Sequence, residues 1–315
     1  MPDKNDPGLA SGVYAALLTP SRPNTTEADA GRMLEYLDSV TRAKVDGLVL
    51  FGSTGEFIHY ELSERMRVVG LAVRRSRVPI LVNVSHSSLA GAFCLAEHAL
   101  NAGAAGILLM PPYFYHFGED QIFHFYKEFA ESFAGSVPIY LYNLPFFTEP
   151  ISPGLATRLL ESGVYAGIKD SSGDWNFFEH LRQLRIGVPF RLLAGNESLY
   201  LRARSAGADG IVSGVSAAIP ELVVAIERSI EQRDLERAEE LNAHLDAFVS
   251  WLRRFPATMA IKQAAASRGW IDRDFAVPPD PGTQDHLHEF QAWFERWLPR
   301  VIADCSIRAT VKSVG

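Results

Sequence analysis

An unbroken alternation of short apolar runs and longer amphipathic segments most constrains what this chain can fold into. Eight apolar runs, each ended by a turn signal, are expected to be strands: residues 13–18, 46–51, 79–84, 106–110, 138–142, 165–169, 190–194 and 209–213. Helical spacing or a short helical segment follows each of them: residues 26–43, 63–75, 89–101, 119–133, 153–161, 175–184, 198–205 and 220–231. Eight strand–helix units with short connections predict an α/β fold, a (β/α)8 TIM barrel, rather than an open sheet. The G-x-G-x-x-G signature of an open dinucleotide-binding sheet is also absent after the first strand.

The chain remains helical beyond the eighth unit. Residues 234–253, 256–268 and 284–302 are predicted helices, and the proline-containing segment 272–285 is a predicted loop. We therefore expect a flexible tail at residues 1–11, the barrel at 12–232 and a C-terminal helical subdomain at 233–315. Apolar positions of this subdomain need something to cover, either the barrel flank or a neighbouring subunit: Leu241, Leu245, Phe248 and Leu252.

Charge and composition exclude several classes of protein. The net charge is −7 and no basic stretch dominates the chain, which argues against a nucleic-acid partner. Two cysteines, Cys94 and Cys305, are too few for a disulfide framework or a metal knuckle. The N-terminal residues lack the apolar core of a signal peptide, and no apolar run is long enough to span a bilayer. We expect a cytoplasmic globular protein with no membrane partner.

Lys169 ends the sixth predicted strand and is followed at once by a polar turn. One interpretation is that its ammonium group reaches water at the mouth of the strand. The other is that the amine is half-buried, where desolvation favours its neutral, nucleophilic form. Because the active site of a (β/α)8 barrel lies at the carboxyl ends of the strands, the ends of the neighbouring strands bear on this choice.

Two other strand ends carry candidate functional groups. The turn G-S-T-G at residues 52–55 offers N–H groups and the hydroxyls of Ser53 and Thr54, which can bind a carboxylate or simply cap the next helix. Tyr142 ends the fifth strand, where it can fill the barrel or act as an acid or base. Together with Lys169, these residues favour a catalytic interpretation.

The motifs G-S-T-G-E at 52–56, Y-N-L-P at 142–145 and G-I-K-D-S-S-G-D at 167–174 resemble the dihydrodipicolinate synthase/N-acetylneuraminate lyase family. The resemblance covers about residues 12–300. It implies a class I, Schiff-base-forming aldolase or dehydratase on a barrel with a helical C-terminal extension, assembled as a homotetramer. It also implies a 2-oxo acid substrate with a pyruvate moiety, and no cofactor.

The same resemblance implies roles for individual residues. Lys169 matches the Schiff-base lysine, Tyr142 the proton-shuttling tyrosine, and Ser53 with Thr54 the pair that grips the substrate carboxylate; Thr54 could also relay protons to Tyr142. Further pocket positions implied by the resemblance, or suggested as hydroxyl-binding candidates, are Ser171, Gly195 and Val212.

Two positions depart from the family pattern. Phe147 occupies the place of the arginine that binds a second carboxylate in dihydrodipicolinate synthase, and Phe146 precedes it. These two rings are either core packing or an apolar wall for the second substrate. Phe114 occupies the place of the inter-subunit tyrosine, so the hydroxyl relay is either cut or supplied by Tyr113 or Tyr115.

Polar residues beside the strand ends leave other possibilities open. Ser172, Asp174 and the pair Asn196-Glu197 could recognise hydroxyls of a sugar acid, or could make turn and capping hydrogen bonds. Metal ligation by His59, His86 and His116, which follow the second, third and fourth strands, is disfavoured because no acidic partners stand at ligand spacing.

The leading hypothesis is a lyase that releases pyruvate from a 2-oxo-3-deoxy acid. The alternatives are dihydrodipicolinate synthase itself, which Phe147 disfavours, and a barrel that has lost catalysis and binds a ligand.

Overall fold

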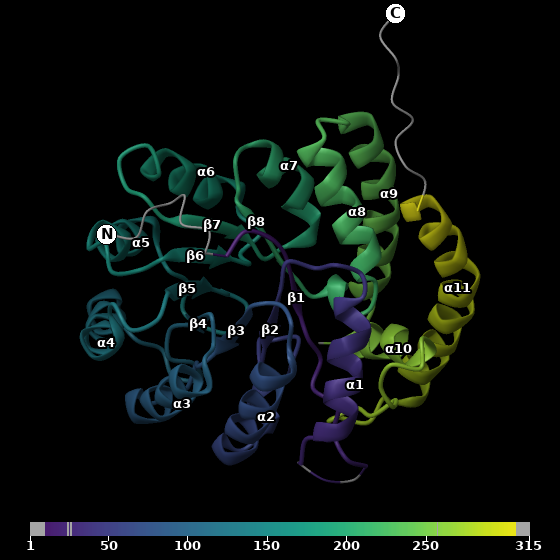
Figure 1. Ribbon diagram of the computed structural model, residues 1–315, viewed down its shortest axis with the longest axis horizontal. Coiled ribbons are helices and arrows are strands. Elements are labelled where there is room, and N and C mark those ends of the chain that lie inside the picture. Colours follow the sequence, from purple (N-terminus) through teal and green to yellow (C-terminus); the bar gives the residue numbers. More distant parts are fainter. Residues whose placement is uncertain (1–9, 24, 26, 257, 307–315) are drawn as a thin grey trace, which may run out of the picture.

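The fold is a closed barrel of eight parallel strands in sequence order, β1 to β8, surrounded by helices (Figure 1). The computed structural model describes residues 10–23, 25, 27–256 and 258–306. The predicted (β/α)8 barrel is therefore confirmed. The strands are β1 Gly12–Ala16, β2 Gly47–Leu50, β3 Ile80–Asn83, β4 Gly106–Leu109, β5 Ile139–Asn143, β6 Gly167–Asp170, β7 Arg191–Ala194 and β8 Gly210–Ser213.

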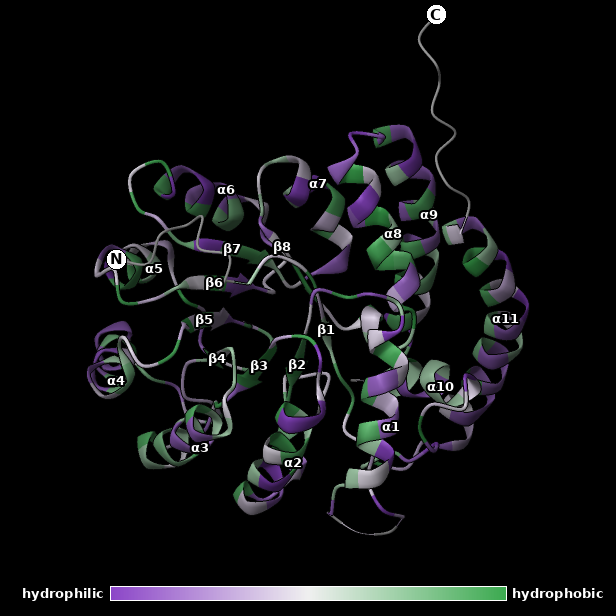
Figure 2. Ribbon diagram, viewed as in Figure 1, coloured by the Kyte–Doolittle hydropathy of each residue, from purple (hydrophilic) through white to green (hydrophobic). Residues whose placement is uncertain are grey.

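Helices of the barrel follow the strands. They are α1 Ala30–Thr41, α2 Leu62–Arg75, α3 Leu89–Ala102, α4 Glu119–Phe133, α5 Pro153–Glu161, α6 Trp175–Leu184, α7 Tyr200–Ser205 and α8 Pro220–Glu231. Of these, α4, α5, α6 and α8 have the predicted bounds, whereas the bounds of α1, α2, α3 and α7 differ from the prediction by one to four residues. Three single-turn 3-10 helices interrupt the connections: Phe57–His59, Glu197–Leu199 and Val215–Ala217. Figure 2 shows hydrophobic and hydrophilic residues side by side on these helices, as expected where one face covers the barrel.

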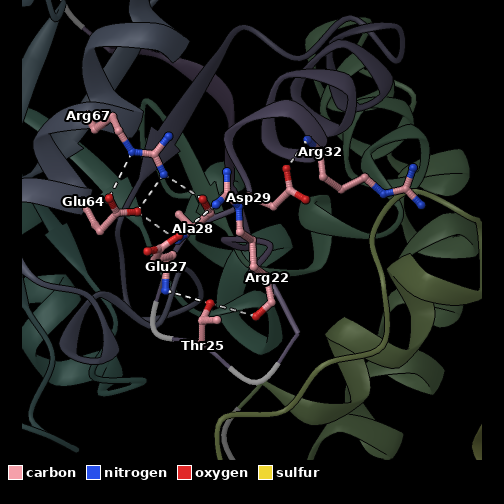
Figure 3. Close-up of polar contacts among 8 residues, drawn as sticks. All are labelled: Arg22, Thr25, Glu27, Ala28, Asp29, Arg32, Glu64 and Arg67. Atoms are coloured by element: carbon pink, nitrogen blue, oxygen red, sulfur yellow. Dashed lines mark hydrogen bonds and ion pairs between the residues drawn. The ribbon is translucent and has the colours of Figure 1, made fainter.

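The start of α1 differs from the prediction. In the sequence, Thr25 and Thr26 are the cap candidates for the helix predicted over 26–43, but the cap is Asp29, whose carboxylate accepts a hydrogen bond from the Arg32 amide (Figure 3). The Thr25 hydroxyl instead donates to the carbonyl of Arg22, and Thr26 lies outside the described residues. A hydroxyl before an apolar helical pattern predicts a cap but does not say which of several candidates adopts the extended backbone that a cap needs.

The inside of the barrel near the amino ends of its strands is filled by tyrosine rings. Tyr14 and Tyr140 are both buried, and each has a glycine of a nearby strand against its ring. A Cβ on Gly47 would lie 2.2 Å from the Tyr14 ring, and one on Gly106 would lie 3.0 Å from the Tyr140 ring. The side chains fill this end as in other barrels of the kind, so the space for chemistry is left at the carboxyl ends.

The C-terminal helices α9 Leu235–Leu252, α10 Met259–Ser267 and α11 Pro281–Ser306 lie together on one side of the barrel, beside α1 and α8 (Figure 1). Leu241, Leu245 and Phe248 are buried, with α9 packed against α8 and α11. The barrel flank is thus what the extension covers. Helix α11 begins before residue 284 because Pro281 starts a helix rather than prolonging the predicted loop. No helix in the described part of the chain has the length and apolarity to cross a membrane.

Candidate active site

Lys169 and Tyr142 face each other at the carboxyl ends of β6 and β5. They are register partners in the β5–β6 ladder, and both side chains are buried, with relative exposures of 3% and 1%. Lys169 Nζ lies 3.9 Å from the centroid of the Tyr142 ring. The amine therefore does not escape to solvent along its strand. It is held inside the barrel against an aromatic face.

A hydroxyl from the β2 end completes this arrangement. Ser53 Oγ and the Tyr142 hydroxyl are 3.1 Å apart, within hydrogen-bond distance. Thr54, the residue considered for a proton relay to Tyr142, lies elsewhere: its Oγ1 faces the backbone after β8, 3.0 Å from where a Cβ of Gly214 would stand. Of the two turn hydroxyls, it is Ser53 that contacts Tyr142.

Gly195 and Ser171 close one side of the Lys169 side chain. A Cβ on Gly195 would lie 2.1 Å from Ser171 Oγ and 3.0 Å from Lys169 Cε. Only glycine leaves the lysine and the serine in place there. Val212 is buried in β8, which lies next to β7 in the barrel wall.

Aromatic residues of the β4 and β5 loops lie outside this buried group. Phe146 and Phe147 are 70% and 64% exposed, so the core-packing alternative for this pair is wrong. Phe114 is 83% exposed and has a left-handed backbone, with φ of +82°. Tyr115 is also largely exposed and packs edge-on against the Phe114 ring.

Tyr113 instead packs against residues of its own chain. Its ring packs edge-on against Phe57, with 5.6 Å between the ring centroids, and its backbone pairs with that of Thr148 in an isolated antiparallel bridge. The β4 and β5 loops are thereby joined. The Tyr142 hydrogen bond that the structure shows comes from Ser53, not from the tyrosines considered as substitutes for Phe114.

Sequence reasoning missed a polar pair directly behind the catalytic candidates. Asn143 Nδ2 donates to Asp170 Oδ1 at 2.8 Å, and the Asn143 carbonyl accepts from the Ser171 amide. Both side chains are buried, and desolvation raises the pKa of Asp170 above its ordinary value, partly opposed by hydrogen bonds from Ser172 and Asn143. Because each is the residue after Tyr142 or Lys169, the pair ties the two strand ends together. Adjacency to the motif residues was the signal that could have found it.

The other candidate polar groups make local hydrogen bonds. Ser172 Oγ donates to Asp170 and accepts from the Asp174 amide, and Asp174 caps α6. Asn196 accepts from the Ser198 amide, while Glu197 Oε1 accepts from the Ser213 hydroxyl and the Val215 amide. These contacts favour the turn and capping alternative for them.

Histidines considered as metal ligands have other contacts. His116 pairs with Glu149, and His86 Nδ1 lies 3.0 Å from the hydroxyl of Ser88. Within residues 10–306, apart from positions 24, 26 and 257, no group of three His, Cys, Asp or Glu side chains is placed to hold a metal ion.

A cavity lies beside the buried group of Lys169 and Tyr142 rather than within it. It has a volume of about 720 Å³ and is lined by residues of the β1 and β2 loops and of the C-terminal extension, including Glu56, His59, Lys262 and Asp274. Lys169 and Tyr142 do not line it.

Comparisons with known proteins point to one family. A family model described as the dihydrodipicolinate synthetase family matches residues 9–296. A 4-hydroxy-tetrahydrodipicolinate synthase of Methanococcoides burtonii is 28% identical over 81% of this chain and 87% of its own length. A probable 2-dehydro-3-deoxy-D-pentonate aldolase of Escherichia coli K12 is 32% identical over 80% of this chain and 85% of its own.

Solved structures show the same fold. A prophage protein of the dihydrodipicolinic acid synthase family from Escherichia coli K12, crystallised in complex with pyruvate, superposes with a TM-score of 0.83 at 24% identity, covering 92% of this chain and 99% of that one.

Proposed function

Because the chain belongs to the dihydrodipicolinate synthetase family, we propose that it is a lyase that forms a Schiff base through Lys169 and releases pyruvate from a 2-oxo-3-deoxy acid. The observation that carries this proposal is the position of Lys169 Nζ, buried 3.9 Å from the ring centroid of a tyrosine whose hydroxyl is within hydrogen-bond distance of Ser53. Enzymes of the family are lyases, and the pentonate aldolase relative is named for cleavage of this class of acid.

The reaction begins at the Lys169 amine. The neutral amine adds to the 2-keto carbon, and loss of the carbinolamine hydroxyl as water leaves an iminium ion. Tyr142 donates the proton that the departing hydroxyl needs, and Ser53 connects that phenol to the substrate side. The iminium then accepts the electron pair of the C3–C4 bond when it breaks, giving an enamine. The C4 hydroxyl gives its proton to the Tyr142 oxygen, and the fragment that contains C4 leaves as an aldehyde. Protonation of the enamine at C3 and hydrolysis of the iminium release pyruvate and restore Lys169.

Substrate binding falls to the turn at residues 52–56 and the walls around Lys169. Ser53 and Thr54 supply hydroxyls, with backbone N–H groups of the turn, for the carboxylate next to the keto group. Gly195, Ser171 and Val212 bound the space beside the lysine, where glycine at 195 leaves room for the reacting carbon. Neither a cofactor nor a metal is needed, since the iminium itself stabilises the carbanion.

Phe147 favours an aldehyde product without a carboxylate. It offers no guanidinium for a second carboxylate, which disfavours dihydrodipicolinate synthase activity although several relatives carry that name. A non-catalytic ligand-binding barrel is disfavoured by the Lys169–Tyr142–Ser53 contacts, since a binding protein needs no amine buried against a hydrogen-bonded phenol.

A homotetramer is the assembly we propose. Exposed apolar side chains on the β2 and β4 loops support association: Ile58, Phe114 and Tyr115 are 64%, 83% and 67% exposed. A light-scattering mass equal to one chain at micromolar concentration would contradict it.

Release of pyruvate from a panel of substrates tests the function. The panel has two parts: 2-oxo-3-deoxy sugar acids, assayed for pyruvate release, and the aldehyde partners of dihydrodipicolinate synthase, assayed for pyruvate consumption. The Lys169→Ala variant serves as the blank. We expect pyruvate from at least one deoxy acid and none with the blank. Pyruvate consumption only with a carboxylated semialdehyde would replace this function with the synthase alternative, and inactivity on the whole panel without any pyruvate adduct would contradict both.

A further inference from the structure

A second buried lysine, Lys262, lies close to the site but outside the proposed chemistry. It belongs to α10 of the C-terminal extension, and its Nζ is 2.5 Å from Glu56 Oε2. The two side chains are 4% and 13% exposed. Nζ also donates to the carbonyl of Asp274, and Thr258 Oγ1 donates to Glu56 Oε1 at 2.8 Å. Both carboxylate oxygens of Glu56 are therefore held by residues of the extension.

Glu56 is the last residue of the turn that carries Ser53. It has a left-handed backbone, with φ of +49°, and its amide donates to the Ser53 carbonyl at 3.0 Å. Such a backbone is unfavourable for glutamate and persists only where its surroundings fix it. The ion pair with Lys262 is one of the contacts that fix it.

The rest of the turn has little freedom. The Gly55 carbonyl accepts a hydrogen bond from Thr19 Oγ1 at 2.9 Å, and a Cβ on Gly55 would lie 3.0 Å from the Leu17 carbonyl and 3.1 Å from the Phe51 backbone. Movement of Glu56 is therefore transmitted through a close-packed backbone to Ser53. Ser53 in turn stands 3.1 Å from the Tyr142 hydroxyl.

Stability alone is a poor reason for such a pair. Burying two charges costs desolvation that their attraction only partly offsets, and apolar replacements of similar size are often neutral. A buried ion pair is more useful for fixing the relative position of the two segments that carry it, because its hydrogen bonds permit few arrangements. The extension already has another anchor on the barrel flank, where Arg268 makes a bidentate pair with Glu221 on α8 and donates to the Ala218 carbonyl.

We propose that Lys262 is a positioning residue for the lyase reaction: through Glu56 it holds the turn at residues 52–56 so that Ser53 meets Tyr142 and the turn binds the substrate carboxylate. This inference rests on the proposed function. It gives the C-terminal extension a part in catalysis, although Lys262 itself touches no reacting atom.

Four variants test it. Lys262→Met keeps the length of the side chain and removes its charge, while Glu56→Gln keeps the shape and an oxygen for the Thr258 hydroxyl. Lys262→Arg keeps the positive charge of the wild-type side chain. Arg268→Met is the matched control, since it removes a different ion pair, between the C-cap residue of α10 and Glu221 on α8 of the barrel.

The first readout is the pyruvate concentration that half-saturates borohydride-trapped adduct on Lys169. Misplacement of a binding group by a fraction of an ångström is costly, so Lys262→Met and Glu56→Gln are expected to raise this concentration about tenfold. Lys262→Arg is expected to keep most of the wild-type affinity for pyruvate. Arg268→Met is expected to leave this affinity at the wild-type value while lowering the melting temperature.

The second readout is amide hydrogen exchange of residues 52–56 in the ligand-free protein, which does not depend on the reaction. We expect faster exchange there in Lys262→Met and Glu56→Gln and wild-type exchange in Arg268→Met. Wild-type affinity and exchange in both turn variants, or equal changes in Arg268→Met, would overturn the positioning role. If the wild type forms no adduct, the proposed function fails and the exchange data alone decide the positioning role. If Lys262→Met does not fold, Glu56→Gln supplies both readouts.

Discussion

Lys169 Nζ lies over the face of the Tyr142 ring, 3.9 Å from its centroid, at neighbouring strand ends of the barrel. The contact places the amine beside the phenol that would exchange protons with its adduct. It separates two functions of Tyr142, because the ring packs under the lysine while the hydroxyl reaches Ser53. The two can be removed independently.

Tyr142→Phe is predicted to leave Lys169 in place and remove proton transfer. The ring remains, so pyruvate should still form an adduct, but turnover should fall by about 10²–10⁴-fold, the usual contribution of a general acid–base. Steady-state kinetics with trapping of the adduct measures both. Tyr165→Phe is a suitable control, since that hydroxyl donates to the Tyr126 carbonyl outside the site. Full turnover in Tyr142→Phe would contradict its role.

Gly195→Ala is predicted to abolish or strongly reduce activity. Its methyl group would lie 2.1 Å from Ser171 Oγ and 3.0 Å from Lys169 Cε, so the lysine or the serine must move. Gly187→Ala is the matched control, because no heavy atom of the described residues, apart from its own and those of its two chain neighbours, would lie within 4 Å of its Cβ. Equal activity of both variants would show that the wall at Gly195 does not constrain Lys169.

Phe147→Arg is predicted to shift substrate preference toward carboxylated aldehydes. The side chain is 64% exposed, so an arginine can be accommodated without disturbing the core, and it would supply the missing guanidinium. The measurement is the ratio of kcat/KM for a carboxylated and an uncharged aldehyde partner. Phe146→Arg, one residue earlier and slightly more exposed, should change this ratio less. An equal change in both variants would mean that only added charge matters.

Asp170→Asn is predicted to alter the pH dependence of stability. Burial raises the pKa of the Asp170 carboxyl, so in the window above its ordinary value the folded protein binds more protons than the unfolded chain. This group therefore favours folding at low pH, and that contribution is lost as pH rises through the folded-state pKa. The unfolding free energy of the variant relative to wild type should increase as the pH rises through the range just above the ordinary pKa of an aspartate carboxyl. A constant difference, measured by urea unfolding across this range, would contradict the sign.

The barrel could be predicted because the sequence pattern that specifies it is short and recurs eight times. Each strand is a short apolar run closed by a turn, and eight of them leave little choice of topology. The predicted start of α1 was wrong because several residues before the helix, Thr25 and Asp29 among them, have side chains that can cap it. Pro281 was assigned to a loop for a similar reason, since proline occurs both in loops and at the first turn of a helix.

The site was predictable to the extent that motif residues occupy strand ends. Lys169, Tyr142 and Ser53 could be brought together in this way. The choice of Ser53 over Thr54 as the partner of Tyr142 could not, because adjacent residues of a tight turn point in directions that only its backbone defines. The Lys262–Glu56 pair was missed because its members are far apart in the sequence and belong to different parts of the fold.

Borohydride reduction in the presence of pyruvate tests whether Lys169 forms a Schiff base. Intact mass and peptide mapping should find one reduced pyruvate adduct per chain, located on Lys169 and absent in Lys169→Ala. Lys262, the other buried lysine near the site, should remain unmodified because its amine is held by Glu56. An unmodified wild-type protein, or an adduct that persists undiminished in Lys169→Ala, would contradict the account.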